Sequence, residues 1–359
     1  MSNYIEYNDI VAFHPGYYIE EIVKSSGLTQ NDFAKRLDTT PKNLSLLIRG
    51  EQDLSIDMAM KLSRMVGTSV QYWLNLQNAF DTLIIKFKSD EELKNELKVF
   101  KALNYKYFKE NYGLKDLSHK RDEQVIQVRN FLGVSTLSVF TRKDMAVNFR
   151  CSSKVITEEN TIRANIMVQI AINEALKVKA PKFNKKIFEN TIEYALTLTE
   201  NHDNFYSKLK EAFFKAGVIF IILPNLPGSK INGATKKIGN NVMLMVNDRR
   251  LNMDSFWFTL FHEIGHIING DFGISFEKDI GEQEEGADRY AENCLISPER
   301  YSEFIKKGNF DLKSIQIFAK QIKREPGIVL GRLQNDGLIK YNDWRMNSLR
   351  HKYKVEINI

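Results

Sequence analysis

Two histidines and a glutamate lie close together in a segment that is otherwise strongly apolar. His262 and His266 are four residues apart, and Glu263 directly follows the first of them. On a helix, positions i and i+4 share one face, so both imidazoles can reach one metal ion. Glu263 then lies beside the ion, where it can take a proton from a water molecule without binding the metal. The spacing predicts a zinc site on a buried helix, with Glu263 as the catalytic residue. Two surface histidines on an amphipathic helix are the alternative, which the apolar neighbours do not favour.

A catalytic zinc site needs a third protein ligand, and residues 283–291 offer one. Catalytic zinc commonly has three protein ligands and a water molecule. Glu284 and Asp288 are again four residues apart. We expect Glu284 to be the third ligand and Asp288 to accept the second ring N–H of a ligating histidine, which would fix its tautomer. Glu282 and Glu285 are near enough in sequence to be confused with Glu284, and an acidic helix start often only complements the helix dipole.

The chemistry that such a site supports is hydrolysis of an amide bond. Zinc lowers the pKa of its bound water toward ~7, and Glu263 would remove the proton and later pass it to the leaving amine. A further group would have to stabilise the oxyanion. Tyr290, Arg249, Arg250 and His202 are all candidates, and their spacing favours none of them.

Residues 210–300 resemble the ImmA/IrrE-type metallopeptidases. The matching pieces are Gly217-Val218, Gly233-Ala234-Thr235, Val246-Asn247, residues 258–266, and residues 284–291 followed by Leu295-Ile296-Ser297-Pro298. The resemblance implies a gluzincin-like endopeptidase fold, a zinc cofactor, and substrates that are often helix-turn-helix repressors. Gly286 departs from the pattern, because a larger residue is more usual there.

The elements that position these residues follow from the apolar pattern. Residues 218–223 are typical of a buried strand, since a β-branched run is ended by Pro224. Further short strands are expected near 233–235 and at 242–246, and most of the remaining chain has helical periodicity. The predicted fold class is mainly α, with a small α+β gluzincin-like domain.

Three parts are expected along the chain. Residues 1–81 would form an all-α, λ-repressor-like helix-turn-helix domain, and residues 82–210 a helical linker or sensor region. Residues 211–359 would form the metallopeptidase domain with C-terminal helices. The middle part contains no motif with a chemical role, and its aromatic cluster at residues 104–108 is more typical of a core than of a ligand site.

The N-terminal part carries two helix starts that are eleven residues apart. Thr29 and Thr40 are suited to be N-caps, and Pro41 stands in a first turn, where proline is tolerated. Small Ala34 allows one helix to cross the next closely. Six polar residues are candidates for contacts with DNA bases or phosphates: Gln30, Thr40, Lys42, Asn43, Ser45 and Arg49. The alternative is a helical bundle that binds only protein.

Residues 12–81 resemble the HigA-type antitoxins of the Xre helix-turn-helix class. The resemblance rests on His14-Pro15-Gly16, residues 27–30, Arg49-Gly50 and residues 73–77. It implies a homodimer that binds operator DNA, and a possible toxin partner. Asp38 stands at a turn position where that class usually has glycine, although aspartate tolerates the left-handed conformation better than most residues. Long chains that join such a domain to an ImmA/IrrE-type peptidase resemble this one over most of its length, including residues 327–333.

Composition limits the class of protein without deciding its function. The net charge is +6, but residues 1–80 hold seven basic and nine acidic side chains, so the predicted DNA-binding part is not globally basic. Two cysteines, Cys151 and Cys294, cannot build a disulfide framework. The first twelve residues lack the pattern of a signal peptide, and no apolar run is long enough for a membrane helix. We therefore expect a cytoplasmic protein without a membrane partner.

Three functions remain open from the sequence. In the first, a DNA-bound regulator uses its zinc peptidase to cut a repressor or an antitoxin. In the second, the protein is an antitoxin and autorepressor whose peptidase fold serves as an interaction or sensing module. In the third, it is a general processing peptidase whose N-terminal part recruits protein. The complete His-Glu-x-x-His motif favours catalysis and the HigA-like part favours regulation, so the first function is the prediction.

Overall fold

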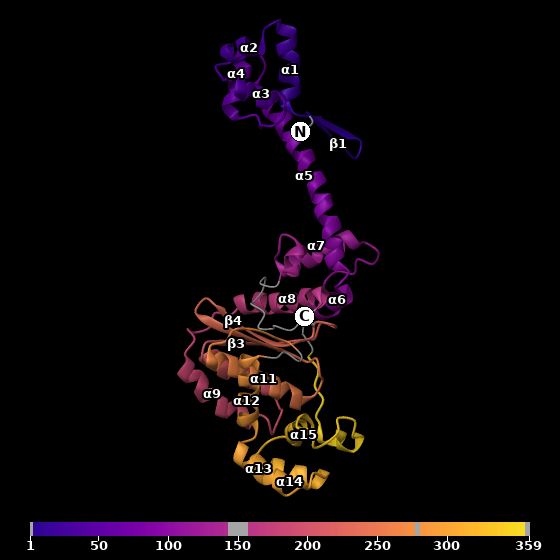
Figure 1. Cartoon of the computed structure of the whole chain (residues 1–359), viewed down its shortest axis with the longest axis vertical. Coiled ribbons are helices and arrows are strands. Elements are labelled where there is room, and N and C mark those ends of the chain that lie inside the picture. The colour runs from indigo at the N-terminus through magenta and orange to yellow at the C-terminus, as the bar shows by residue number, and fades with distance from the viewer. Residues whose placement is uncertain (1–2, 143–156, 277–280, 356–359) are drawn as a thin grey trace. The chain divides into compact units, whose positions relative to one another are not determined.

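The chain forms two compact units in the computed structural model, which describes residues 3–142, 157–276 and 281–355 (Figure 1). Unit 1 extends from Met1 to Asn95, and unit 2 from Glu96 to Ile359. Helix α5 (Val70–Phe100) continues without a break through residue 81, where the sequence suggested a boundary. The domain limits at residues 81 and 210 stay predictions.

Unit 1 consists of a β-hairpin followed by short helices, so the expectation of an all-α part over residues 1–81 is wrong at the hairpin. Its elements are β1 (Tyr4–Tyr7), β2 (Ile10–Phe13), α1 (Pro15–Ser26), α2 (Gln30–Arg36), α3 (Pro41–Ile48), α4 (Ile56–Val66) and the first part of α5. The two strands are antiparallel, and the turn residues Asn8 and Asp9 both have positive φ, 51° and 60°. That conformation suits the two-residue turns that join twisted hairpin strands.

Side-chain caps begin the two central helices of unit 1, as the sequence predicts. The Thr29 hydroxyl accepts the N–H of Asp32 at 3.2 Å, and the Thr40 hydroxyl accepts the N–H of Asn43 at 3.1 Å. Both helices pack on a core that contains Trp73. The caps fix where α2 and α3 begin, and the shared core holds the two helices together.

Unit 2 is a larger body of helices around one small sheet. Its elements are α6 (Tyr105–Tyr112), α7 (Arg121–Leu132), a 3-10 turn (Leu137–Thr141), α8 (Glu158–Leu176), α9 (Lys185–Thr197), α10 (Phe205–Lys215), β3 (Val218–Leu223), β4 (Ile231–Ile238), β5 (Asn241–Asn247), α11 (Met253–Asn269), β6 (Gly273–Phe276), α12 (Glu282–Leu295), α13 (Pro298–Lys306), α14 (Leu312–Ile322), α15 (Pro326–Asn335) and a 3-10 turn (Trp344–Leu349). The expectation of a mainly helical chain with a small sheet is confirmed.

The sheet has the order β3-β5-β4-β6, with β3 parallel to β5 and the other pairs antiparallel. Helices α8 and α11 cover its two faces (Figure 1). Strand β3 is buried along its whole length, and Val218, Phe220 and Ile222 belong to the core that includes α11. Because successive strand residues point to opposite faces, the intervening residues face the side that α8 covers. The strand therefore needs the continuous apolar run that the sequence contains.

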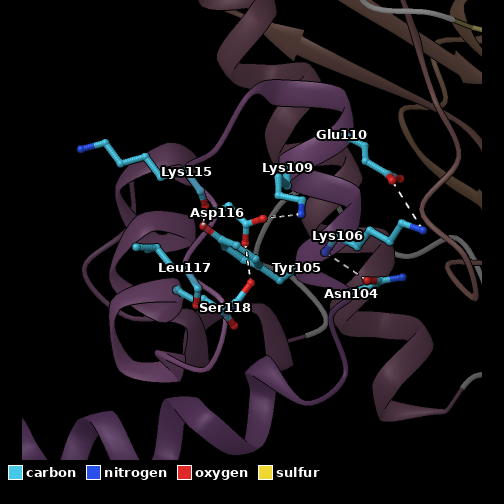
Figure 2. Close-up of polar contacts among 10 residues, drawn as sticks. Asn104, Tyr105, Lys106, Lys109, Glu110, Lys115, Asp116, Leu117 and Ser118 are labelled. Carbon is cyan, nitrogen blue, oxygen red and sulfur yellow. Dashed lines mark hydrogen bonds and ion pairs between the residues drawn. The ribbon is translucent and has the colours of Figure 1, made fainter.

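The segment that follows α6 is held by polar contacts, as Figure 2 shows. The Tyr105 hydroxyl donates to the carbonyl oxygen of Lys115 at 2.7 Å, and Lys109 Nζ lies 2.9 Å from Asp116 Oδ2. The Ser118 hydroxyl donates to Asp116 Oδ1 at 2.7 Å. Tyr107 and Phe108, the other two aromatic residues of the cluster at residues 104–108, are buried. The cluster is therefore part of the core, as expected.

Cys294 is free and half-buried, while Cys151 lies outside the described residues. Among the residues that the structure describes, none of the helices combines the length and the apolar character that crossing a bilayer requires.

Candidate functional site

Helix α11 carries the predicted metal ligands through the interior of unit 2. It is apolar on most sides, and it ends at Gly270, which has a left-handed conformation with φ 81° and donates its N–H to the last turn. Because the helix lies between the sheet and α12, its polar residues are buried with it. His262 is 7% exposed and His266 is fully buried. A buried pair of imidazoles needs polar partners, and α12 supplies them.

Three side chains that could bind a metal meet between α11 and α12. Nε2 of His262 lies 3.0 Å from Nε2 of His266 and 3.0 Å from Oε2 of Glu284. Nε2 of His266 lies 3.3 Å from the other oxygen of Glu284. Of the three glutamates that begin α12, Glu284 is buried and Glu282 and Glu285 are exposed. Of these glutamates, α12 therefore directs Glu284 toward the two histidines, and Glu284 is the residue that the sequence favoured.

The spacing of these atoms fits a divalent metal ion. Two tetrahedral ligands at about 2.0–2.1 Å from zinc are about 3.3 Å apart. The three observed separations, 3.0, 3.0 and 3.3 Å, are close to that value. Two imidazoles and one carboxylate are also a donor set that catalytic zinc uses. The assignment of zinc to this cluster stays a prediction.

The electrostatics of the cluster favour positive charge. Burial is the largest influence on His262 and lowers its pKa, but hydrogen bonds to Asp288 and Glu284 outweigh burial and raise the pKa to about 10. Burial raises the pKa of Glu284, yet His262 and His266 together hold that pKa well below its usual range. A proton and a metal ion therefore compete for the same three side chains, and acid should release the metal.

Asp288 lies where it can orient His262. Its Oδ1 is 2.7 Å from Nδ1 of His262, the ring nitrogen that faces away from the cluster. An N–H···O bond there fixes the tautomer and leaves Nε2 free to bind a metal. Asp288 is half-exposed, so it supports the ligand from the outer edge of the cluster.

Glu263 is fully buried, and neither of its carboxylate oxygens has a hydrogen-bond partner among the described residues. It packs against the backbone of Gly233 on strand β4. A Cβ atom added at Gly233 would lie 2.5 Å from Oε1 of Glu263, so the absence of a side chain makes room for the carboxylate. A buried carboxylate without partners is costly, and such groups commonly have a catalytic role or bind an ion or water.

The four candidates for stabilising an oxyanion are in different surroundings. Tyr290 packs against Gly265 on α11, while His202 lies beside Glu325 and His351. Arg249 and Arg250 follow β5, and the Arg249 guanidinium is 3.4 Å from the side chain of Asn232. These contacts do not single out one of the four, so the oxyanion group stays unassigned.

The α2–α3 turn of unit 1 has the geometry that a helix-turn-helix requires. Asp38 is in the left-handed conformation with φ 53°, as its position in the turn predicts. Lys61 from α4 donates to the Asp38 carbonyl oxygen at 2.8 Å and lies 3.2 Å from its carboxylate.

The predicted DNA-contacting side chains lie at this turn and along α3. Gln30, Thr40, Lys42 and Arg49 are exposed, and Asn43 and Ser45 are partly buried. A shallow cleft at the turn is lined by Lys35, Asp38, Thr39, Thr40, Lys42, Asn43 and Leu46. Lys35 and Thr39 were not predicted from the sequence, although the basic end of α2 at residues 35–36 was a signal for the first.

Two predicted contact residues already have partners within unit 1. The Arg49 guanidinium donates to Glu51 at 2.9 and 3.0 Å and also contacts the hydroxyl of Ser45. The Thr40 hydroxyl is the cap of α3. Lys42 is the clearest candidate for a phosphate contact, because it is exposed beside the cleft.

Comparison with known proteins places the N-terminal region in a family. Residues 19–73 match the helix-turn-helix family model. Virulence-associated protein I of Dichelobacter nodosus is 36% identical over 75 residues, which cover 21% of this chain and 69% of that protein. The uncharacterized helix-turn-helix-type transcriptional regulator YddM of Escherichia coli K12 is 39% identical over 66 residues, which cover 18% of this chain and 70% of the relative.

A solved structure matches a similar share of the chain. An addiction module antidote protein of the HigA family from Coxiella burnetii is 28% identical, with a TM-score of 0.22, and the match covers 23% of this chain and 91% of that one. The family match and the geometry of the α2–α3 turn agree. By its N-terminal domain, this chain belongs to the helix-turn-helix family of DNA-binding transcriptional regulators.

Proposed function

We propose that this protein is a DNA-binding regulator that carries a zinc-dependent endopeptidase of gluzincin-like fold in unit 2. The observation that carries the peptidase proposal is the buried cluster of His262, His266 and Glu284 with Glu263 beside it. Three ligand-type side chains and an unpartnered carboxylate in one interior site have an energetic cost that a purely structural site would avoid.

His262, His266 and Glu284 would hold the zinc ion, and Asp288 would keep His262 in the binding tautomer. When bound, zinc polarises a carbonyl group and makes water more acidic. The remaining coordination position would be open to water and substrate, as catalytic zinc sites require.

Glu263 would move the proton during amide hydrolysis. It lies one residue after a ligand, and its buried oxygens accept no hydrogen bond from the described residues. It can therefore accept the proton of the attacking water and deliver that proton to the leaving nitrogen. Gly233 keeps the backbone of β4 close, so the carboxylate has little freedom to turn away.

The substrate that we propose is a repressor or an antitoxin. One support is the resemblance to the ImmA/IrrE-type peptidases, which often cut helix-turn-helix proteins. The other is that unit 1 itself matches the helix-turn-helix family. A DNA-binding unit would concentrate the peptidase at an operator, where such a substrate is bound. Unit 1 would bind operator DNA as a homodimer, as its HigA-like sequence implies.

The test of the peptidase is substitution of the base without loss of the metal. Wild type, Glu263→Gln and the exposed control Glu285→Gln are loaded with zinc and incubated with peptides prepared from a bacterial proteome. New termini are then identified by mass spectrometry. We expect cleavage by wild type and Glu285→Gln, and a loss of at least ~100-fold in Glu263→Gln. Equal cleavage by all three proteins would refute the role of Glu263.

The test of DNA binding is an electrophoretic shift with DNA from upstream of the protein's own gene. We expect Lys42→Ala to weaken binding and to reduce the slope of log affinity against log salt concentration by about one. Lys24→Ala is the matched control, because Lys24 is exposed on α1 and paired with Glu20 and Glu21. No shift with the intact protein at low salt would refute operator binding.

A second function is favoured by the family of unit 1. In it, the protein is an antitoxin and autorepressor that binds a toxin, and unit 2 serves as an interaction or sensing module. DNA binding together with a metal-free, inactive unit 2 would support this alternative. Zinc in the His262 cluster with proteolysis that depends on Glu263 would exclude it.

A further inference from the structure

A second group of histidine and glutamate side chains meets in unit 2. His202 lies between α9 and α10, Glu325 directly precedes α15, and His351 belongs to the C-terminal segment. One potential ligand atom of each lies within 4.8 Å of the other two. Nδ1 of His351 is 2.5 Å from Oε1 of Glu325, and Nε2 of His202 is 3.3 Å from Oε2. Two imidazoles and one carboxylate therefore face one small volume.

Glu325 does not act as a helix cap. It occupies the N-cap position of α15, yet its side chain accepts no N–H of that helix. The residue is 2% exposed, and its Oε2 has no hydrogen-bond partner among the described residues. Both ring nitrogens of His202 are also buried without such a partner, because the 3.3 Å approach to Oε2 is not aligned as a hydrogen bond. Buried polar atoms normally have partners, so these three atoms point to a missing ligand.

The surrounding structure holds the three side chains in place. Oε1 of Glu325 accepts the backbone N–H of His351 at 3.2 Å, and the His351 carbonyl oxygen accepts the N–H of Met253 at 2.9 Å. The ring of His202 lies 6.2 Å from the ring of Trp257 on α11 and 5.4 Å from that of His351. The group is therefore organised by contacts that do not involve a metal, as a prepared site should be.

We propose that His202, Glu325 and His351 form a second metal site, which binds a divalent cation of the zinc class independently of the His262 cluster. The donor set selects this class of ion. Imidazole nitrogen with one carboxylate oxygen suits Zn²⁺ and its neighbours, whereas Ca²⁺ and Mg²⁺ prefer oxygen ligands throughout. The His351 side chain is 68% exposed, which gives an ion a path from solvent and leaves room for water as a further ligand.

The role of this ion is structural. It joins the loop before α10, the start of α15 and the C-terminal segment, which are far apart in the sequence. The same C-terminal segment contacts the beginning of α11 through the His351–Met253 hydrogen bond and an ion pair of 3.1 Å between Arg350 and Asp254. An ion held there stabilises the position of the helix that carries His262 and takes no part in the reaction.

The number of zinc ions bound by full-length, tag-free protein tests this proposal. Equilibrium dialysis against zinc followed by elemental analysis should give two ions per chain for wild type. It should give one for His351→Ala, one for His262→Ala and none for the double variant. His119→Ala is the matched control, since His119 is an exposed histidine outside both groups, and it should keep two. If wild type binds one zinc ion per chain and His351→Ala also binds one, the second site is refuted, whatever the result for His262→Ala.

Thermal unfolding gives an independent result if a variant loses stability. Zinc should raise the Tm of His262→Ala, which keeps only the second site, and should leave the Tm of the double variant unchanged. His202→Ala replaces His351→Ala as the second-site change if the latter folds poorly. A zinc-dependent increase that is equal in the single and double variants would overturn the proposal, because the ion would then bind elsewhere.

Discussion

Gly233→Ala tests whether the close contact between strand β4 and Glu263 matters. Gly233 is not in the left-handed region, so its backbone accepts alanine without strain. The added Cβ, however, would lie 2.5 Å from Oε1 of Glu263, 2.7 Å from Cγ and 2.8 Å from Cδ. Gly233 is paired with Val246 on β5 and Ser275 on β6, so the strand cannot easily retreat. The carboxylate has to move.

The expected size of the effect follows from these distances. An ordinary carbon contact needs about 3.5 Å, so Glu263 must shift by about 1 Å in an interior that has little free space. Overpacking of this kind costs about 1–3 kcal/mol of unfolding free energy. A displacement of about 1 Å at a catalytic group can lower the rate ~100-fold. We therefore expect both a lower Tm and a large loss of peptide cleavage.

The assay compares cleavage rate, zinc content and thermal unfolding for wild type, Gly233→Ala and Gly286→Ala. Gly286 is the matched control: it lies on α12 near Glu284, and an added Cβ would meet only one atom of Asn269, at 4.0 Å. Alanine there should raise stability by about 0.5–1 kcal/mol, because glycine is unfavourable within helices. Gly233→Ala with wild-type stability and wild-type cleavage would refute the position given to Glu263.

Further predictions concern the contact between Asp288 and His262, the α2–α3 turn of unit 1, and the buried His14. Asp288→Asn should weaken zinc binding about 10–100-fold in a chelator competition, since the ligand would lose the carboxylate that orients it; unchanged affinity would contradict that role. Asp38→Gly should raise the free energy of unfolding by about 0.5–1 kcal/mol, because it removes a left-handed non-glycine residue. It should also tighten DNA binding, because it removes a negative charge from the cleft at the α2–α3 turn. Weaker binding in a shift assay would contradict a DNA-binding role for this cleft. Burial lowers the pKa of His14 despite the opposing influence of Asp53 and Asp81. The unfolded chain therefore takes up the proton first, and stability should be complete above pH ~6.5 and fall as the pH decreases below it. His14→Asn, which keeps a capping acceptor, should remove this acid sensitivity in hydrogen exchange of α1; the same sensitivity in the variant would exclude His14 as its source.

The sequence was most informative where one element carries a complete pattern. The i, i+4 spacing of His262 and His266 requires only a helix, and β3 required only one apolar run. The positive φ of Asp38 followed from its place in the turn. In each case local geometry sets the result, so a single sequence could predict it.

Features that depend on distant segments could not be predicted in the same way. The choice of Glu284 over its acidic neighbours depends on which side of α12 faces α11. The contact between Gly233 and Glu263 depends on the packing of β4 against α11. The contact between His351 and Glu325 depends on the path of the C-terminal segment. None of these leaves a periodic signal.

Two local features were missed although signals existed. Residues 4–13 form a hairpin around Asn8-Asp9, a turn pair that tolerates positive φ. Helix α5 is continuous from residue 70 to residue 100, although the sequence suggested a boundary at residue 81. Its mixed composition lacks a single apolar stripe, so periodicity gave a poor estimate of its limits.

Zinc content of variants that carry only the first site tests the central claim most directly. His351→Ala serves as the parent, so that ions at the second site are not counted. We expect about one zinc ion per chain in this parent, one after Glu263→Gln, and none after Glu284→Gln. That result would assign Glu284 as a ligand and leave Glu263 free for proton transfer. A parent that binds no zinc, or an ion that survives Glu284→Gln, would contradict the site on which the proposed peptidase rests.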